Sequence, residues 1–235
     1  METCTQDAVL VPMQVSADAL AETIAGLRNV ANLAGFVVTV PHKTAMVALC
    51  DVLSDAARMV GAVNVVQRTS EGQLYGHILD GEGFVSGLRL SGINPAGRST
   101  YIAGAGGAAN AIAFALAAAG VSRIGIWNRT GTKAEELAVR LSRMENALEV
   151  RVESADPTGY DIVVNATSLG LREDDPMPFA VDRLTADQVV AEIIMKPEWT
   201  PLLLEAKRRG CTVALGAPML DCQLSLMADF MGVPA

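Results

Sequence analysis

STYIAGAGGAANAIAFALAAAGVSRIGIWNRT, residues 99–130, is the stretch that decides the fold. It starts with a β-prone run, continues through the glycine-rich turn Gly104-Ala105-Gly106-Gly107-Ala108, and ends its first half in an alanine-rich helical run. A dinucleotide site needs strand, turn and helix in this order, because small residues let the backbone approach a pyrophosphate and N–H groups at the helix start face the anion. Glycine clusters also mark ordinary turns, so the flanking strand and helix carry the prediction.

The end of the second β-prone run indicates which dinucleotide is bound. That run, residues 124–127, is followed by Asn128-Arg129-Thr130. An NAD site expects an acidic residue here, about 20 residues past the glycines, to bond the ribose 2′-hydroxyl. Residues 121–134 contain no Asp or Glu, whereas Arg129 stands at the strand end with Lys133 close by. Since arginine pairs with a phosphate through two charge-assisted hydrogen bonds, the sequence predicts NADP.

The composition is that of a well-packed globular protein. Of the 235 residues, 51% are hydrophobic and 19% are charged, unlike a disordered chain. The net charge of −8 argues against nucleic acid or anionic membranes as main partners. The start of the chain lacks the basic residues of a secretory signal. No Cys-x-x-Cys pair and no ligand-type histidine spacing occur, so we expect a cytoplasmic protein without a metal site and with four reduced thiols, Cys4, Cys50, Cys211 and Cys222.

Strand-type and helix-type segments alternate along the chain, which predicts an α/β protein with parallel sheets covered on both faces. We expect strands at residues 8–12, 36–40, 63–68, 100–103, 124–127, 161–165, 189–194 and 212–215. We expect helices at residues 17–27, 44–52, 83–91, 108–119, 132–143, 201–209 and 219–231. A turn-rich segment precedes the glycine-rich region. It predicts a smaller α/β domain over residues 1–92 and a Rossmann-type, doubly wound domain over residues 93–216, with the C-terminal helix, residues 217–235, packing back on the first.

Lys43 is the first candidate for proton transfer. A buried strand is expected to stop at Pro41, and proline is typical of the first turn of a helix. Lys43 would then lie in that first turn, where the positive end of the helix dipole disfavours a cation. A lysine in this place loses its proton more easily and suits general acid–base catalysis, whereas the alternative is an ordinary solvated lysine.

Three further polar residues stand at positions that local sequence explains only in part. Asp80 precedes Gly81-Glu82-Gly83-Phe84 and an expected helix, so by itself it is favoured as an N-cap. Asn64, at the end of Gly61-Ala62-Val63-Asn64, is compatible with a turn amide. Gln223 lies on an apolar helix, where a buried amide needs a partner from the backbone or from a ligand.

Taken together, eight segments of the chain resemble the shikimate/quinate dehydrogenase family. Their order and spacing hold from about Ala8 to Gly232, which is nearly the whole chain. The segments are VTVPHK (38–43), GAVN (61–64), DGEGF (80–84), GAGGA (104–108), NRT (128–130), VNATSLG (164–170), TPLL (200–203) and GAPML (216–220).

This resemblance implies a two-domain, NADP-dependent oxidoreductase with a catalytic cleft between its domains. It implies a hydroxylated carbocyclic acid as substrate, of the shikimate, 3-dehydroshikimate or quinate type. Lys43 would exchange the proton of the reacting hydroxyl, and Asp80 would hydrogen-bond the same group. Substrate contacts are implied for Thr39, Asn64 and Gln223. The implied cofactor residues are Gly104, Ala105, Gly106, Gly107 and Ala108 at the phosphates, Asn128, Arg129, Thr130 and Lys133 at the adenosine phosphate, and Ile193 and Gly216 at the nicotinamide.

The sequence also departs from the family pattern. No Ser-x-Ser motif, which binds the substrate carboxylate in the family, precedes Lys43, so we expect either a truncated form or another anchor for the acid. Val37 replaces an Asn, Ile78-Leu79 replace Asn-Thr, Glu192 replaces Asp and Met195 replaces Tyr. Because several exchanges remove hydrogen-bonding groups, we expect weaker discrimination for a polyhydroxylated ring and a best substrate other than shikimate. A missing edge strand would expose backbone and favour association, so a homodimer is predicted.

Two other functions are compatible with the sequence. One is a non-catalytic, regulatory NADP-binding protein whose substrate domain is incomplete; the presence of Lys43 and Asp80 favours an enzyme over it. The other is oxidation of an aminated ring acid.

Overall fold

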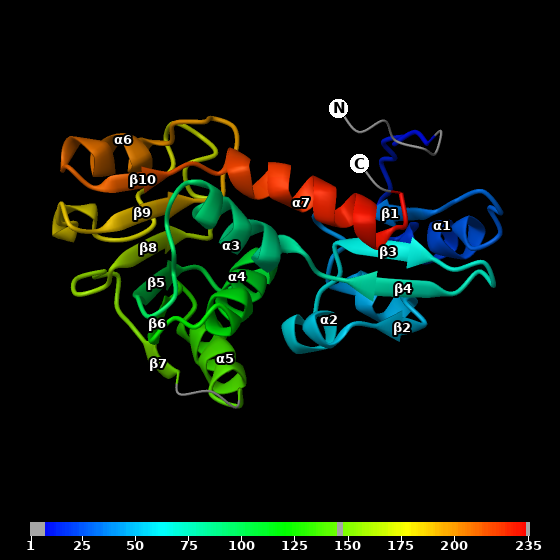
Figure 1. The fold of residues 1–235 in the computed structure, drawn as a ribbon, viewed down its shortest axis with the longest axis horizontal. Helices are drawn as coiled ribbons and strands as arrows, with labels where there is room; N and C mark the ends of the chain where they lie inside the picture. The colour runs from blue at the N-terminus through cyan, green and yellow to red at the C-terminus, as the bar shows by residue number, and fades with distance from the viewer. Residues whose placement is uncertain (1–7, 145–147, 234–235) are drawn as a thin grey trace. The chain divides into compact units, whose positions relative to one another are not determined.

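The computed structural model describes residues 8–144 and 148–233 (Figure 1). Within these ranges the chain forms two compact units. Unit 1 combines the described residues up to Leu79 with those from Gln223 onward, and unit 2 is Asp80–Cys222. The chain passes from one unit to the other after Leu79 and again inside its last helix, α7 (Ala217–Phe230).

Unit 2 contains a six-stranded sheet in the order β10-β9-β8-β5-β6-β7. Every neighbouring pair in it is parallel. Counted from β5 along the chain, this order is 3-2-1-4-5-6, the doubly wound order of dinucleotide-binding sheets. The predicted Rossmann-type domain is therefore confirmed. Its strands are β5 (Ser99–Ala103), β6 (Arg123–Trp127), β7 (Glu149–Val152), β8 (Ile162–Asn165), β9 (Val189–Glu192) and β10 (Thr212–Ala214).

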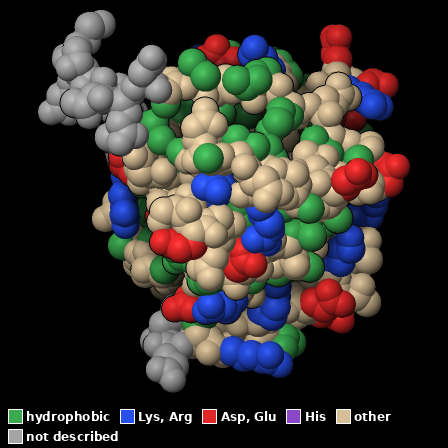
Figure 2. All heavy atoms as spheres, turned by 90° about the vertical axis from the view of Figure 1, so that its right-hand side faces the viewer, with side chains coloured by type: hydrophobic (Ala, Val, Ile, Leu, Met, Phe, Trp, Pro, Cys, Tyr) green, Lys and Arg blue, Asp and Glu red, His purple; other side chains and the backbone are tan. Residues whose placement is uncertain are grey.

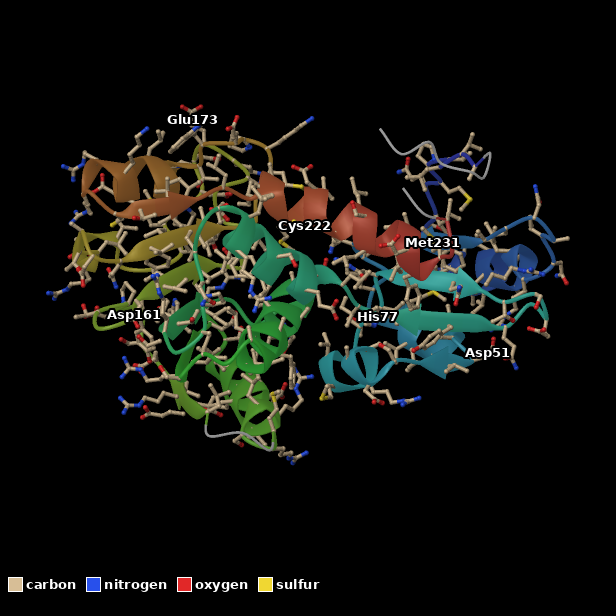
Figure 3. All side chains as sticks on the ribbon, in the orientation of Figure 1. Asp51, His77, Asp161, Glu173, Cys222 and Met231 are labelled. Atoms are coloured by element: carbon tan, nitrogen blue, oxygen red, sulfur yellow. The ribbon has the colours of Figure 1, made fainter. Side chains whose placement is uncertain are left out.

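The central strands of this sheet are buried along their whole length, because helices cover the sheet. All residues of β5, β8 and β9 are buried. At the start of two of these strands, the backbone N–H and hydroxyl of Ser99 each donate to Asp161, at 2.7 Å; Figure 3 labels this aspartate. The helices of unit 2 are α3 (Asp80–Leu90), α4 (Gly107–Ala118), α5 (Gly131–Leu141) and α6 (Pro201–Arg208), with a 3₁₀ turn, η2 (Val181–Arg183).

Helix α3 belongs to unit 2 because it packs closely against α4. A Cβ atom on Gly81 would overlap the carbonyl oxygen of Ala111 and lie 2.6 Å from the Cβ of Ala115, so only glycine permits this approach. The helix begins at Asp80, three residues earlier than predicted. Helix α6 has a clear start signal, since the hydroxyl of Thr200 accepts from the N–H of Leu203 and Pro201 follows it.

Unit 1 contains a mixed sheet in the order β1-β3-β4-β2. The β1–β3 and β3–β4 pairs are antiparallel, and β2–β4 is parallel. The expectation of parallel sheets was therefore wrong for this unit. A short hairpin between β3 and β4 imposes the antiparallel pairing. Its elements are α1 (Leu20–Leu27), β1 (Gly35–Val37), η1 (Ala45–Leu49), β2 (Val52–Leu53), α2 (Asp55–Val60), β3 (Val65–Arg68) and β4 (Leu74–His77).

The C-terminal part of α7 packs on the sheet of unit 1. Met227 lies in one buried cluster with Val65 and Leu79. The ring of Phe230 stacks on His77 with centroids 5.1 Å apart; Figure 3 labels His77 and Met231 in this part of the unit. Among the described residues, no helix combines the length and apolarity that crossing a membrane requires.

The strand predicted at residues 8–12 was wrong. These residues form no strand, and Val9, Leu10 and Val11 are 85%, 75% and 64% exposed. A strand needs a hydrogen-bonded neighbour, and in the described part of the chain β1 pairs with β3 alone.

Viewed from the side of unit 1, hydrophobic side chains gather around a hollow near the upper edge (Figure 2).

Candidate active site

The glycine-rich turn joins β5 to α4 and leaves an open stretch of backbone. Gly104 has a φ of +120°, and a Cβ atom there would lie 2.7 Å from the carbonyl oxygen of Ala166. Its N–H donates to the carbonyl of Trp127 at 2.7 Å, which fastens the turn to the end of β6. Gly106 and Gly107 are exposed, and a Cβ atom on either would meet nothing within 4 Å. The turn therefore has room for a ligand to approach the backbone closely.

Helix α4 presents its N-terminus at this turn. Gly106 is its N-cap and provides no side-chain cap. Asn110, which sequence reasoning missed, donates from its side-chain amide to the carbonyls of Ala105 (3.2 Å) and Gly106 (2.8 Å) and accepts from Arg140. With these carbonyls engaged, the N–H groups of the first helical turn face outward, so the loop fits a pyrophosphate. One polar residue within an alanine-rich helix was the signal available in the sequence.

The segment after β6 lies at the same edge of the sheet, because Ala103 and Trp127 are paired in register. The side-chain amide of Asn128 donates to the carbonyl of Thr130 at 2.9 Å, which holds this turn ahead of α5. Arg129 and Lys133 are exposed, and neither forms a salt bridge in the part of the chain that the structure describes. Two cations beside a glycine-rich turn fit the 2′-phosphate of NADP.

The remaining predicted cofactor residues come after strands β9 and β10, in the other half of the sheet. Ile193 comes directly after β9, and Gly216 comes shortly after β10. A Cβ atom on Gly216 would overlap the carbonyl oxygen of Ile194, so the two segments lie against each other. The predicted cofactor residues thus gather along the carboxyl edge of the unit 2 sheet, where open α/β sheets bind their ligands.

Lys43 lies in a turn of unit 1 rather than in a helix, which corrects the prediction. The helix that follows is a 3₁₀ helix that starts only at Ala45. The carbonyl of His42 accepts from the N–H of Met46, and that of Thr44 from the N–H of Val47, so no continuous α-helical ladder forms. Lys43 therefore does not lie in the first turn of an α-helix, and no helix dipole acts on it as predicted. Its side chain is half-buried, and its carbonyl accepts from the N–H of Val63 at 2.9 Å.

Asn64 connects separate segments of unit 1 by hydrogen bonds. It is 1% exposed, and its side-chain oxygen accepts from the N–H of Leu79 at 2.9 Å. Its backbone carbonyl accepts from the N–H of Val38 at 2.7 Å, and its N–H donates to His77. Asn64 thereby holds the segment before Thr39 and the residue before Asp80.

Thr39 is exposed and contributes to a cavity of about 330 Å³ in unit 1, whose lining includes Val37, Val40, His42 and Met46. Gln223 is 7% exposed on α7. Asp80 is 4% exposed and is the first residue of α3, not the N-cap that precedes a helix. Thr39, Lys43, Asn64 and Gln223 belong to unit 1, and Asp80 is the first residue of unit 2.

Comparisons with known proteins identify the family. Residues 1–66 match the shikimate dehydrogenase substrate binding domain, and residues 91–170 match the shikimate / quinate 5-dehydrogenase family. The shikimate dehydrogenase (NADP(+)) of Rubrobacter xylanophilus is 42% identical over 218 residues, covering 90% of this chain and 76% of that protein. The chain belongs to the shikimate dehydrogenase family.

Two solved structures extend the comparison. A shikimate 5-dehydrogenase from Thermus thermophilus, in complex with NADP(H) and shikimate, is 33% identical with a TM-score of 0.83, covering 94% of this chain and 81% of that one. A ligand-free 5-ketofructose reductase from a Gluconobacter species is 38% identical with a TM-score of 0.83, covering 93% of this chain and 80% of that one. The two-domain architecture of a shikimate dehydrogenase, predicted from the sequence, is therefore confirmed.

Two glycine variants separate folding from cofactor binding. Gly104→Ala should lower the free energy of unfolding by about 2 kcal/mol or more, because its φ is positive and the carbonyl of Ala166 is too close. Gly106→Ala should lower the melting temperature only slightly, because nothing surrounds its Cβ position although alanine is a poorer N-cap than glycine. It should weaken NADP binding by placing a methyl group at the pyrophosphate. Thermal melts and NADP titrations check both, and a stable Gly104→Ala would contradict the prediction.

Proposed function

We propose that this protein is an NADP-dependent dehydrogenase that transfers a hydride between NADP and a hydroxylated carbocyclic acid of the shikimate, 3-dehydroshikimate or quinate type. The observation that carries the proposal is an open glycine-rich turn and an exposed Arg129 at the edge of a doubly wound sheet, in a chain 42% identical to a shikimate dehydrogenase (NADP(+)). The family resemblance favours this function over a non-catalytic NADP-binding protein.

The proposed roles follow the chemistry of a carbinol. NADP, when bound, supplies the hydride acceptor. Lys43 takes the proton of the reacting hydroxyl, and Asp80 hydrogen-bonds the same oxygen. Thr39, Asn64 and Gln223 contact the substrate. The half-buried side chain of Lys43 supports its role, because a general base acts best where little water competes for its proton.

We propose a division of labour along the chain. Residues 1–92 together with residues 217–235 act as the substrate domain, and residues 93–216 act as the NADP-binding domain; helix α3, within the first of these ranges, packs in unit 2. The doubly wound sheet supports the second assignment. The packing of Met227 and Phe230 on the sheet of unit 1 supports the place of the C-terminal helix.

A second candidate substrate is a neutral polyhydroxy ketone. Of the two solved structures described above, the 5-ketofructose reductase is the more identical one, at 38% against 33%. The cavity wall around Thr39 is formed by Val37, Val38 and Val40, which offers apolar contact to a substrate without a charge.

A substrate comparison decides between these functions. We expect kcat/KM for the oxidation of shikimate or quinate with NADP to exceed kcat/KM for the NADPH-dependent reduction of 5-ketofructose by about tenfold, because the chain is 42% identical to a shikimate dehydrogenase (NADP(+)). The reverse order would favour the keto-sugar reaction. Turnover of none of them by a protein that still binds NADP would support the non-catalytic alternative.

We also propose a homodimer and a cytoplasmic location. The exposed side chains of Val9, Leu10 and Val11 and the edge position of strand β1 support association, because unpaired strand edges and apolar side chains are covered in stable assemblies. Light scattering on a size-exclusion column tests it. Among the described residues, Cys50, Cys211 and Cys222 are free thiols, which supports a reducing compartment, and Cys4 lies outside the described residues.

A further inference from the structure

Glu192 is a buried carboxylate that the proposed chemistry does not use. It is the last residue of β9, lies at the carboxyl edge of the unit 2 sheet, and is 1% exposed. No salt bridge to it occurs in the ranges 8–144 and 148–233. Burial raises the pKa of this carboxyl, against hydrogen bonds from its neighbours that favour the ionised form. A group that costs free energy to bury needs a compensating role.

Four donors from three segments converge on this carboxylate. The side-chain amide of Asn165 donates to both oxygens, at 3.1 and 3.0 Å. The backbone N–H groups of Ile193 and Ile194 donate to Oε1 at 2.9 and 3.2 Å, and the hydroxyl of Thr200 donates to Oε2 at 3.1 Å. Since every partner donates, an ionised carboxylate is the side chain that satisfies all of them.

Asn165 extends the network into the loop that follows β8. Its amide also donates to the carbonyl of Leu169 at 2.9 Å, and its oxygen accepts from the N–H (3.1 Å) and the hydroxyl (2.7 Å) of Thr167. The hydroxyl of Thr167 in turn accepts from the N–H of Leu169 at 3.0 Å. Glu192 holds Asn165, and Asn165 in turn fixes the shape of the loop over residues 165–170.

The anchored segments lie where a doubly wound sheet binds its ligand. The strand order reverses between β5 and β8, and the crevice outside their carboxyl ends is the binding position. The turn at Gly104 approaches the carbonyl of Ala166, in the loop that Asn165 shapes. Gly216 approaches Ile194, whose N–H is held by Glu192. Arg129, by contrast, follows β6 on the other side of β5.

We propose that Glu192 is a positioning residue: its carboxylate holds the loop over residues 165–170 and the segment Ile193-Ile194 in the arrangement that receives the nicotinamide half of NADP. It acts through these segments and touches neither the adenosine phosphate nor the glycine-rich turn. The inference rests on the proposed NADP site and adds to it a buried organising group.

A fragment of the cofactor makes the inference testable. Adenosine 2′,5′-bisphosphate contains the adenosine half of NADP and lacks the nicotinamide half. For Glu192→Gln we expect NADP to bind about tenfold more weakly, as loss of a charged hydrogen bond implies, with the affinity for the bisphosphate within about twofold of the wild type. Isothermal titration calorimetry measures both ligands, and a thermal melt of each variant accompanies it.

Gln188 supplies a matched control at the opposite end of β9. It is 2% exposed, and its amide donates to the carbonyls of Pro157 (3.1 Å) and Tyr160 (2.8 Å). Gln188→Met should lower the melting temperature without changing the affinity for either ligand. A second pair of variants covers the case in which Glu192→Gln fails to fold. Thr200→Val, which removes the donor to Glu192, should weaken NADP binding. Thr200→Ser, which keeps that donor, should bind NADP as the wild type does.

The possible results separate cleanly. Selective loss of NADP affinity in Glu192→Gln or in Thr200→Val supports the inference. Unchanged NADP affinity in the variants that fold, or an equal loss for NADP and the bisphosphate, overturns it. Failure of the wild-type protein to bind NADP at all would instead overturn the proposed function.

Discussion

Replacing Lys43 by alanine should lower turnover by a factor of about 10²–10⁴, the usual contribution of a general acid–base group. The affinity for NADP should change by less than about twofold, because Lys43 belongs to unit 1 and the predicted cofactor residues belong to unit 2. The variant keeps the backbone carbonyl of residue 43, which accepts from the N–H of Val63 and holds this turn, so we expect it to fold. Steady-state kinetics and an NADP titration measure the two effects.

Two controls sharpen this result. Lys43→Arg keeps a positive charge but holds its proton at all accessible pH values, so it should not restore turnover. Lys207→Ala removes a lysine that lies over the ring of Trp199 on the surface of unit 2 and should leave the rate unchanged. Turnover retained in Lys43→Ala would remove this residue from the mechanism.

Arg129→Ala should lower the affinity for NADP about 10- to 100-fold, the range expected for loss of a charge-assisted pair of hydrogen bonds. NAD, which has no 2′-phosphate, should bind with the same affinity as before. The exposed position of Arg129 adds a second signature: part of its contribution is screened by salt, so the difference between NADP and NAD should shrink as ionic strength rises.

An arginine beyond the other end of helix α5 provides the comparison for this experiment. Arg143 is exposed just past the end of α5, whereas Arg129 lies ahead of the start of that helix. Arg143→Ala should affect neither cofactor. Equal losses of NADP and NAD affinity in Arg129→Ala would show that the arginine acts on something other than the phosphate.

The sequence predicted the dinucleotide unit well because its signals are local. The turn at Gly104, the buried run of β5 and the start of α6 at Thr200-Pro201 each depend on a few consecutive residues. The elements that it missed are short or exposed. Strand β2 (Val52–Leu53) has two residues, and β7 (Glu149–Val152) alternates charged with apolar residues and has no fully buried position. Their pairing partners, not their own residues, stabilise them.

The candidate active site was likewise predicted only where local sequence signals exist. Lys43 and Asn64 stand in recognisable segments, and this is why the sequence marks them. The helix predicted around Lys43 does not form, because the chain turns into a short 3₁₀ helix at Ala45. The contacts of Glu192 reach Asn165, 27 residues earlier, and no local pattern predicts a hydrogen bond across two neighbouring strands. The sequence marked Glu192 as a departure from the family pattern without indicating that it would be the centre of a buried network.

The formation of reduced nicotinamide is the most direct measurement of hydride transfer. Purified protein at catalytic concentration is mixed with excess NADP and excess shikimate or quinate, and the absorbance band of the reduced cofactor is followed. We expect many equivalents of reduced cofactor per protein molecule with the wild type, formed about 10²- to 10⁴-fold faster than with Lys43→Ala. A wild-type protein that binds NADP but forms no reduced cofactor with any hydroxylated carbocyclic acid would contradict the proposed function.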